Sequence, residues 1–392
     1  MSKEKCRVLF FHAEFPSGGG ERVTRDIARG VRDFGYETYV ATCWKKAGPS
    51  SEVILLELPD KKVNTQKNAD AIIGMIQSLS IDIFVLPGFL WDYLEYVRER
   101  VQCRFVYILH NIPLWEVVAK RERRKHTQGS LLKKLEWYLI AYPKFAWFKS
   151  YDKLFIKRYK EVYNLVDAYV ALCAGYKTEL EDVLKLPIEN KIYVINNSER
   201  IIDHVNLENK KKQILFVGNM TYENKRVDRL LDIWGMIYER VPDWELVLVG
   251  GGQEKESLEK KSICMGLQRV VFVGGTQNVQ PYYDEASVFC LTSTFEGWPL
   301  CLSEAQANGV VPIAFNCCAG VQEMLSPSGV NGVLVSPFDL NAFADALYQL
   351  LTSSVALEKM KHNVIQKSHD YSLDRIGKQW FDLFETLKIK IE

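Results

Sequence analysis

Short apolar runs that recur at helix-length intervals constrain the fold of this chain more than any other feature. Residues 8–11 form the first run, and a glycine-rich loop and a helical pattern as far as Gly35 follow it. Comparable runs in the first half lie at 38–41, 54–58, 83–86, 105–109, 168–172 and 192–195. A second series lies at 214–218, 245–249, 270–273, 286–291, 310–315 and 332–335. This alternation predicts an α/β protein with parallel sheets.

The length of the chain predicts two domains. At 392 residues it exceeds the size at which single hydrophobic cores stop growing. The polar stretch 198–212 separates the two strand series and is the best candidate for a linker. Ligand loops at the carboxyl ends of two such sheets predict a cleft between two facing domains.

Composition indicates an ordinary globular protein, with 25% charged residues and a net charge of +1. No apolar run reaches 18 residues, and the first residues lead directly into a strand, so we expect the protein to be made and kept in the cytosol. Nine cysteines without paired metal-ligand spacing argue for reduced thiols.

The segment 295–304, Phe-Glu-Gly-Trp-Pro-Leu-Cys-Leu-Ser-Glu, combines two carboxylates with a turn and a helix start. Proline is favoured at the first helical position, which predicts a helix over 299–308 with Gly309 as its left-handed stop. Glu296 then lies on a loop and Glu304 inside the helix. The free N–H groups of the first turn would suit a phosphate or a sugar hydroxyl.

With this spacing the segment resembles the E-x7-E signature of retaining glycosyltransferases, in particular glycosyltransferase family 4 of the bacterial surface-polysaccharide type. The resemblance covers nearly the whole chain and implies the GT-B fold, with two Rossmann-like, doubly wound domains facing a central cleft. It implies an acceptor-side domain over 1–198, which includes a basic aromatic helical segment at 115–165. A nucleotide-sugar-binding domain follows over 199–370, and a final helix, 371–392, crosses back to the first domain.

The resemblance also implies which residues hold the donor diphosphate. Residues 217–231 are similar to the family's Val-Gly-Arg-Leu and Lys-Arg segment, so Lys225 and Arg226 are donor-binding candidates. Asn219 stands where the family has Arg, and it offers a hydrogen bond without a charge.

The two glutamates have different implied roles. Glu304 would accept hydrogen bonds from the donor ribose, and Glu296 would lie beside the transferred sugar as a catalytic residue. His110, at the end of a strand, matches the family's cleft histidine and is the second catalytic candidate. The remaining donor-binding candidates are Gly297, Trp298, Pro299, Leu300, Gly274, Gly275, Gly19 and Gly20. The glycines at 250–252 are interpreted as a packing turn rather than a phosphate loop.

The co-substrate expected from the resemblance is a UDP- or GDP-linked sugar. No Asp-x-Asp stands in the cleft-forming segments, so we expect neither a metal nor another cofactor.

Residues 120–160 are strongly basic and aromatic. They contain thirteen Lys or Arg against three acids, Glu122, Glu136 and Asp152, with nine aromatic residues interleaved. Such a mixture suits an anionic membrane surface. The alternative is a helical excursion whose aromatics pack on the first domain and whose lysines are solvated. No nucleic-acid partner is expected, because the chain is nearly neutral and has no recognised binding fold.

The sequence is therefore interpreted as a hexosyltransferase that moves a sugar from a nucleotide donor to a saccharide or lipid-linked saccharide, with retention, in capsule or lipopolysaccharide synthesis. It would act in the cytoplasm, with peripheral contact to the inner face of the membrane as an open possibility. Two alternatives remain: a non-catalytic nucleotide-sugar or carbohydrate-binding GT-B protein, and a GT-B enzyme acting on a soluble sugar. The departure at Asn219 is the main support for the first of these.

Overall fold

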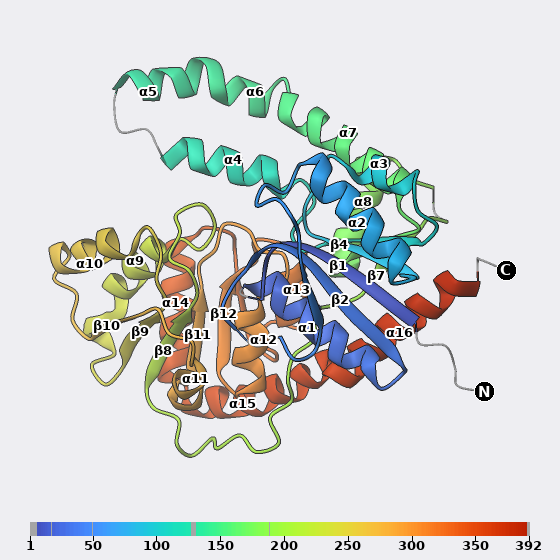
Figure 1. The fold of residues 1–392 in the computed structure, drawn as a ribbon. Helices are drawn as coiled ribbons and strands as arrows, with labels where there is room; N and C mark the ends of the chain where they lie inside the picture. Colours follow the sequence, from blue (N-terminus) through green and yellow to red (C-terminus); the bar gives the residue numbers. More distant parts are fainter. Residues whose placement is uncertain (1–5, 17, 49, 127–130, 188, 390–392) are drawn as a thin grey trace. The chain divides into compact units, whose positions relative to one another are not determined.

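The structure, a computed structural model, describes residues 6–16, 18–48, 50–126, 131–187 and 189–389 (Figure 1). The chain divides into two compact units. The first unit contains the chain up to residue 113, residues 153–198 and the chain from residue 372 onward. The second unit contains residues 114–152 and 199–371. Residues 114–152 thus group with the second unit, although the sequence pattern places them in the N-terminal domain.

The first unit is built on a seven-stranded parallel sheet with the order β3-β2-β1-β4-β5-β6-β7. Its strands are β1 (Cys6–Phe15), β2 (Tyr36–Lys45), β3 (Ile54–Glu57), β4 (Ile83–Pro87), β5 (Arg104–Leu109), β6 (Ala168–Ala171) and β7 (Ile192–Val194). Consecutive residues of β4 and β6 are buried, as expected for strands covered on both faces. Every predicted strand of this half is present.

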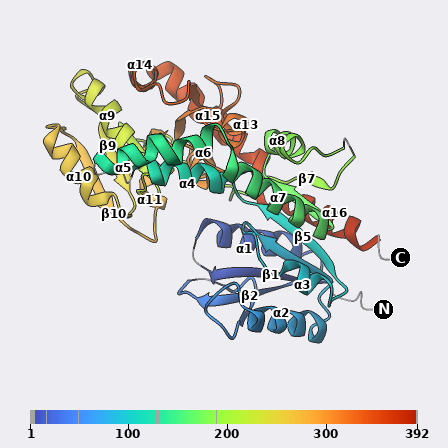
Figure 2. The same cartoon turned by 90° about the horizontal axis from the view of Figure 1, so that it is seen from above.

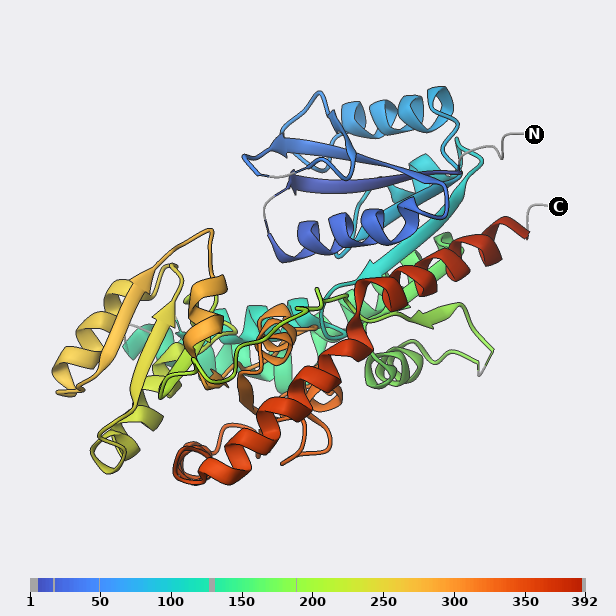
Figure 3. The ribbon, with the colours of Figure 1, turned by 90° about the horizontal axis from the view of Figure 1, so that it is seen from below.

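Helices cover both faces of this sheet. They are α1 (Gly19–Arg32), α2 (Gln66–Ser78), α3 (Leu94–Arg98), most of α7 (Ser150–Leu165), α8 (Ala174–Leu184) and α16 (Leu373–Ile389). Helices α1 and α2 lie on opposite faces (Figure 2, Figure 3). Helix α16 packs closely on α1, and glycines at the crossing allow this close approach. A Cβ atom on Gly30 would lie only 2.6 Å from the Cα of Gly377. The last helix of the chain is therefore part of the first unit.

The second unit contains a six-stranded parallel sheet with the order β10-β9-β8-β11-β12-β13. Its strands are β8 (Gln213–Val217), β9 (Glu245–Val249), β10 (Val270–Gly274), β11 (Val288–Leu291), β12 (Val311–Phe315) and β13 (Val333–Val335). The predicted strands of the second half are all present.

The helices of the second unit fall into two groups. Those around the sheet are α9 (Val227–Ile237), α10 (Lys255–Cys264), α11 (Gln280–Glu285), α12 (Leu300–Ala307), α13 (Ala319–Leu325), α14 (Leu340–Thr352) and α15 (Ser354–Ser368), with 3-10 turns at Tyr238–Arg240 and His369–Tyr371. The others come from the inserted segment: α4 (Trp115–His126), α5 (Leu131–Glu136), a π-helical turn (Trp137–Ala141) and α6 (Tyr142–Ala146). Helix α9 packs against α14, and α12 packs against α15.

Both sheets have the doubly wound strand order. In each, the first strand of the series lies beside the fourth, so β1 neighbours β4 and β8 neighbours β11. At such a switch point the connections leave in opposite directions, and the carboxyl ends of the two strands leave room for a ligand. The loops that follow β8 and β11 are thereby positioned to form a site in the second unit.

Candidate functional site

The loops after β8 and β11 are tied to each other by hydrogen bonds. The Thr294 N–H donates to the Asn224 carbonyl (2.6 Å), and the Thr292 hydroxyl donates to the Arg226 carbonyl (3.0 Å). The Arg229 guanidinium donates to the Thr292 carbonyl (3.1 Å). Because each of these bonds ends on a backbone atom of one of the two loops, the loops and the start of α9 are held in a fixed relation.

A buried ion pair between Lys225 and Glu296 lies where these loops meet. The Lys225 Nζ is 2.7 Å from the Glu296 Oε1, and the two side chains are only 16% and 9% exposed. The Ser293 hydroxyl donates to the same carboxylate oxygen (2.6 Å). Burial lowers the pKa of Lys225, but the nearby Glu296 carboxylate outweighs this effect and raises the pKa above its ordinary value. The ammonium group therefore stays charged at any physiological pH.

The segment between the two glutamates forms the start of α12. Pro299 is the N-cap residue with an extended backbone, and no side chain caps the first turn. Residues 296–299 are buried, and the helix ends before Gly309, whose φ is +66°. The predicted helix start and left-handed stop are confirmed to within one residue. The Trp298 ring packs edge-on against Tyr371, with 4.9 Å between the ring centroids.

Glu304 is held by a tyrosine from another helix. The Tyr283 hydroxyl, from α11, donates to the Glu304 Oε2 (2.7 Å). Burial, followed by the charge of Glu304, raises the pKa of Tyr283 well above its ordinary value, so the hydroxyl remains a donor. Glu304 itself is half-buried. Its carboxylate is thus oriented by a fixed donor.

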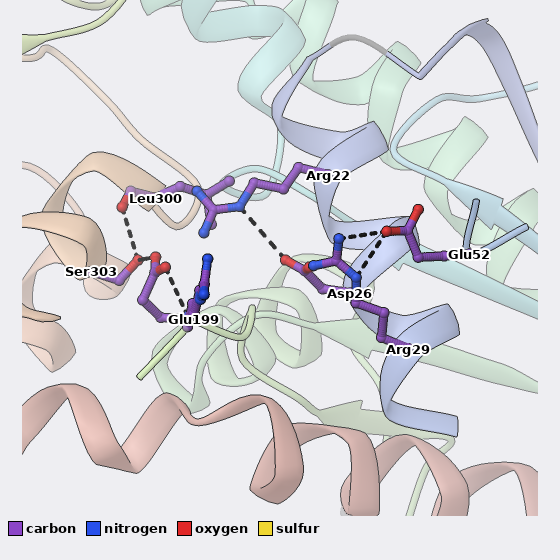
Figure 4. Close-up of polar contacts among 8 residues, drawn as sticks. Arg22, Asp26, Arg29, Glu52, Glu199, Leu300 and Ser303 are labelled. Atoms are coloured by element: carbon purple, nitrogen blue, oxygen red, sulfur yellow. Dashed lines mark hydrogen bonds and ion pairs between the residues drawn. The ribbon is translucent and has the colours of Figure 1, made fainter. Parts of the chain in front are cut away.

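The neighbouring Ser303 connects α12 to the segment that enters the second unit (Figure 4). Its hydroxyl lies 2.7 Å from a carboxylate oxygen of Glu199 and 2.8 Å from the Leu300 carbonyl. The Glu199 N–H in turn donates to the Tyr371 carbonyl (2.7 Å). These contacts hold the first turn of α12 against Glu199.

The other donor-binding candidates near β8 have different surroundings. Arg226 forms a two-bond ion pair with Asp228 (2.9 and 2.8 Å), and its guanidinium lies 4.2 Å from the centre of the Tyr222 ring. Asn219 is exposed directly after β8. A Cβ atom on Gly252 would lie 2.4 Å from the Asn219 Oδ1. The close approach supports the interpretation of the 250–252 glycines as a packing turn.

Gly274 and Gly275 lie at the end of β10, on the edge of the sheet. The Gly274 carbonyl accepts from the Gly250 N–H (2.9 Å). Strand β9 lies between β10 and β8, so these glycines are farther from the Lys225–Glu296 pair than the loops described above.

A second cluster lies at the carboxyl ends of β1, β4 and β5 in the first unit. Gly19 and Gly20 open α1, and a Cβ atom on Gly20 would lie 3.8 Å from the His110 ring. Gly88, after β4, approaches the same ring, since a Cβ atom on it would lie 3.3 Å from the His110 Cδ2. Burial, with a smaller effect from His12, lowers the pKa of His110 to about 3. The predicted Gly20 and His110 are therefore neighbours, and the imidazole is neutral.

An ion-pair network joins side chains of α1 to Glu52 (Figure 4). Asp26 lies 3.6 Å from Arg22 and 3.3 Å from Arg29, and Arg29 also binds Glu52 through Nε (3.0 Å). Burial raises the pKa of Glu52, but the hydrogen bond from Arg29, a backbone hydrogen bond and the charges of Arg29 and Arg25 together outweigh burial and lower the pKa. Arg22 is thus engaged with its own helix.

Sequence reasoning missed four residues that shape these clusters: Ser293, Tyr283, Glu199 and Gly88. Ser293 stands three residues before Glu296, in a loop that follows a predicted strand. Its closeness to Glu296 in the sequence could therefore have indicated it as a site residue. Tyr283 is 21 residues from Glu304 and carries no motif.

Two features are absent from the described residues. None of the His, Cys, Asp and Glu side chains in the described ranges form a group of three or more suited to a metal ion. Among the described residues, every helix is either too short or too polar to span a bilayer.

The match to a known protein family lies within the second unit. Residues 211–353 match the family described as glycosyl transferases group 1. An uncharacterized glycosyltransferase of Haemophilus influenzae is 31% identical, over 55% of this chain and 60% of its own length. The amylovoran biosynthesis glycosyltransferase AmsD of Erwinia amylovora is 30% identical, over 56% of this chain and 63% of its own length. A lipopolysaccharide 1,6-galactosyltransferase of Salmonella typhimurium is 26% identical, over 53% of this chain and 58% of its own length. The chain thus spans about three fifths of the length of the curated relatives it matches.

Solved structures match nearly the whole chain. Sucrose-phosphate synthase from Thermosynechococcus elongatus aligns with a TM-score of 0.75 and 17% identity, over 98% of this chain and 100% of that one. Anabaena HepE in complex with UDP and glucose aligns with a TM-score of 0.72 and 15% identity, over 97% of this chain and 100% of that one. At these identities the likeness shows the fold, which is GT-B with two Rossmann-like parallel-sheet domains.

Proposed function

We propose that the protein is a hexosyltransferase that transfers a sugar from a nucleoside-diphosphate donor to a saccharide or lipid-linked saccharide. The observation that carries this proposal is the set of Lys225, Glu296 and Glu304 at one switch point, inside the residues that match the glycosyl transferases group 1 family. A cation, two oriented carboxylates and an uncapped helix start together suit a sugar joined to a diphosphate.

Each group has a separate task in this proposal. The Lys225 ammonium would bind the diphosphate and neutralise the charge that develops as the sugar leaves. The N–H groups at the start of α12, which no side chain caps, would add to this binding. Glu304, held by Tyr283, would accept the ribose hydroxyls, while Glu296 would bind the transferred sugar and face the positive charge at its anomeric carbon.

The comparisons support the class of product. The Erwinia amylovora relative is named for amylovoran biosynthesis, and the Salmonella relative is named as a lipopolysaccharide galactosyltransferase. The HepE structure holds UDP and glucose. We therefore propose a UDP- or GDP-linked donor and a role in surface polysaccharide synthesis, in capsule or lipopolysaccharide.

Several finer features belong to the same proposal. Transfer would retain the anomeric configuration through front-face attack, without a metal or another cofactor. Gly19, Gly20 and His110 would serve the acceptor or the donor phosphate. The enzyme would act in the cytoplasm, at the inner face of the membrane where a lipid-linked acceptor lies.

A donor screen tests the proposal on the full chain. UDP-glucose, UDP-galactose, UDP-N-acetylglucosamine and GDP-mannose are compared by thermal shift, and release of nucleoside diphosphate is then measured with lipid-linked saccharide extracts. The variant Glu304→Gln should lose the shift and the release. The matched control Glu285→Gln alters a carboxylate on α11 whose side chain is 46% exposed and which pairs with Lys211 at 2.8 Å, and it should retain both. Donor binding without turnover on any acceptor would favour the non-catalytic alternative, and equal activity in both variants would refute the role of Glu304.

A further inference from the structure

The inserted segment of the second unit exposes large apolar side chains between residues 135 and 148. We call these seven side chains the exposed apolar surface, and each is between 43% and 74% exposed. They are Leu135, Tyr138, Leu139, Ile140, Tyr142, Trp147 and Phe148. Surface hydrophobic residues scattered singly need no explanation, but seven within fourteen positions form a patch that does.

This surface is not the face by which the segment packs on the protein. Trp137, Ala141 and Phe145 recur every four residues and are only 7%, 2% and 6% exposed. The Phe145 ring lies 4.7 Å from that of Tyr151, and Lys120 lies 3.9 Å from the centre of the Tyr151 ring. One side of the helical stretch is thus already buried, and the exposed apolar surface is additional to that packed side. Large apolar side chains outside the packed face of a helix are expected to have a second apolar environment.

Cations border the exposed apolar surface. Residues 133–149 contain four lysines and one acid, Glu136. Lys134, Lys144 and Lys149 are exposed. Trp and Tyr rings beside Lys are the combination that suits the boundary between headgroups and acyl chains, where rings and lysine stems lie in the apolar layer and the charges reach anionic groups. The border of positive charge favours a partner with an anionic surface, which a bilayer of anionic lipid provides.

We propose that the exposed apolar surface, with Lys134, Lys144 and Lys149, rests on an anionic lipid bilayer. Each lysine near anionic headgroups strengthens partitioning about fivefold at low salt. Two or three such lysines and a few inserted rings give binding that is reversible and sensitive to salt. The inference deepens the proposed function, because it brings the enzyme to the surface that holds a lipid-linked acceptor.

The test is flotation of the full chain with vesicles of phosphatidylcholine alone or with 30 mol% phosphatidylglycerol, at 50 and 500 mM NaCl. The protein should float with the anionic vesicles at 50 mM salt and not with phosphatidylcholine alone. Trp147→Ser with Phe148→Ser, and separately Lys144→Glu with Lys149→Glu, should each weaken binding at least tenfold. The control Ile263→Ser with Val355→Ser removes side chains that are 78% and 82% exposed elsewhere in the unit, and it should bind as the parent does.

The outcomes separate this inference from the proposed function. Absence of binding to anionic vesicles at 50 mM salt, or equal loss in the Ile263 and Val355 control, would overturn it. A dimer in sedimentation that dissociates in the Trp147 and Phe148 variant would assign the surface to a second copy of the chain and also overturn it. Nucleoside diphosphate release with a detergent-dispersed acceptor should persist in that variant, so a failed flotation leaves the activity to be judged independently. Circular dichroism of each variant checks its folding.

Discussion

Replacing Glu296 by Gln should separate stability from nucleotide binding at the candidate site. Glu296 and Lys225 are nearly buried and 2.7 Å apart, a distance at which two unit charges attract by about 6 kcal/mol at an effective dielectric constant of 20. Much of that attraction is offset by desolvation of the two groups. Removing one partner of a buried pair costs about 3 to 5 kcal/mol, because the other charge is left uncompensated.

We expect the lower end of that range for Glu296→Gln. The amide oxygen can still accept hydrogen bonds from Lys225 and Ser293, so only the charge is lost. A loss of about 3 kcal/mol in a domain of this size lowers Tm by about 6 to 12 °C. The matched control is Asp243→Asn, which breaks an ion pair with Lys212 at 3.1 Å whose side chains are 71% and 60% exposed. That change should lower stability by less than about 1 kcal/mol.

Nucleotide should reverse the defect of the Glu296→Gln variant. With the carboxylate gone, the effect of burial, which lowers the pKa of Lys225, is no longer offset by Glu296, so the ammonium lacks that counter-charge. A bound diphosphate supplies that counter-charge. UDP or GDP should therefore raise the Tm of the variant by several degrees more than that of the parent, while turnover falls. Differential scanning fluorimetry with and without 1 mM nucleotide measures both effects. Equal nucleotide-induced shifts in the two proteins would refute the contact between Lys225 and phosphate.

Three other perturbations follow from the geometry. Tyr283→Phe removes the hydroxyl that orients Glu304, so the KM for the donor should rise about tenfold with little change in kcat. Gly252→Ala should destabilise by about 2 kcal/mol or more in urea unfolding, because φ is +138° and the new Cβ would meet an atom at 2.4 Å; Gly251→Ala, with no atom within 4 Å, should be nearly neutral. Between pH 7 and pH 5 the parent should lose up to about 2 kcal/mol of its free energy of unfolding through His110, and His110→Gln should not show that loss. The reason is that the unfolded histidine takes up a proton below its ordinary pKa of 6.5, whereas the folded one does so only near 3.

Each of these has an outcome that contradicts it. An unchanged donor KM in Tyr283→Phe would separate Glu304 from the donor. Equal stability of the alanine variants at 251 and 252 would mean that the turn does not need the close approach to Asn219. A pH dependence of unfolding in His110→Gln identical to that of the parent would show that the folded imidazole titrates normally.

The sequence predicts the strands and the two-glutamate loop because their causes are local. Apolar runs such as residues 8–11 are buried in the sheets, and proline and glycine define the ends of α12 at Pro299 and Gly309. Hydrogen bonds between distant elements carry no such local signature. The pairing of Tyr283 with Glu304, and of Glu199 with Ser303 over 104 positions, depends on the packed structure.

The basic aromatic segment shows the same limit. The sequence alone does not indicate which of its aromatic residues are buried. In the structure Trp137 and Phe145 are buried, whereas Tyr138 and Trp147 are exposed. The segment also contacts residues that are distant from it in the sequence. Arg123 forms a two-bond ion pair with Glu223 (2.5 and 3.1 Å), which helps to group residues 114–152 with the second unit.

The most direct test of the account is a crystal structure of the full chain with bound UDP or GDP, whichever gives the larger thermal shift. The account predicts the terminal phosphate within hydrogen-bond distance of the Lys225 Nζ and the start of α12, with the ribose hydroxyls on the Glu304 carboxylate. A nucleotide bound at any other place, with the Lys225–Glu296 pair and the Glu304 side chain free of ligand contacts, would contradict it.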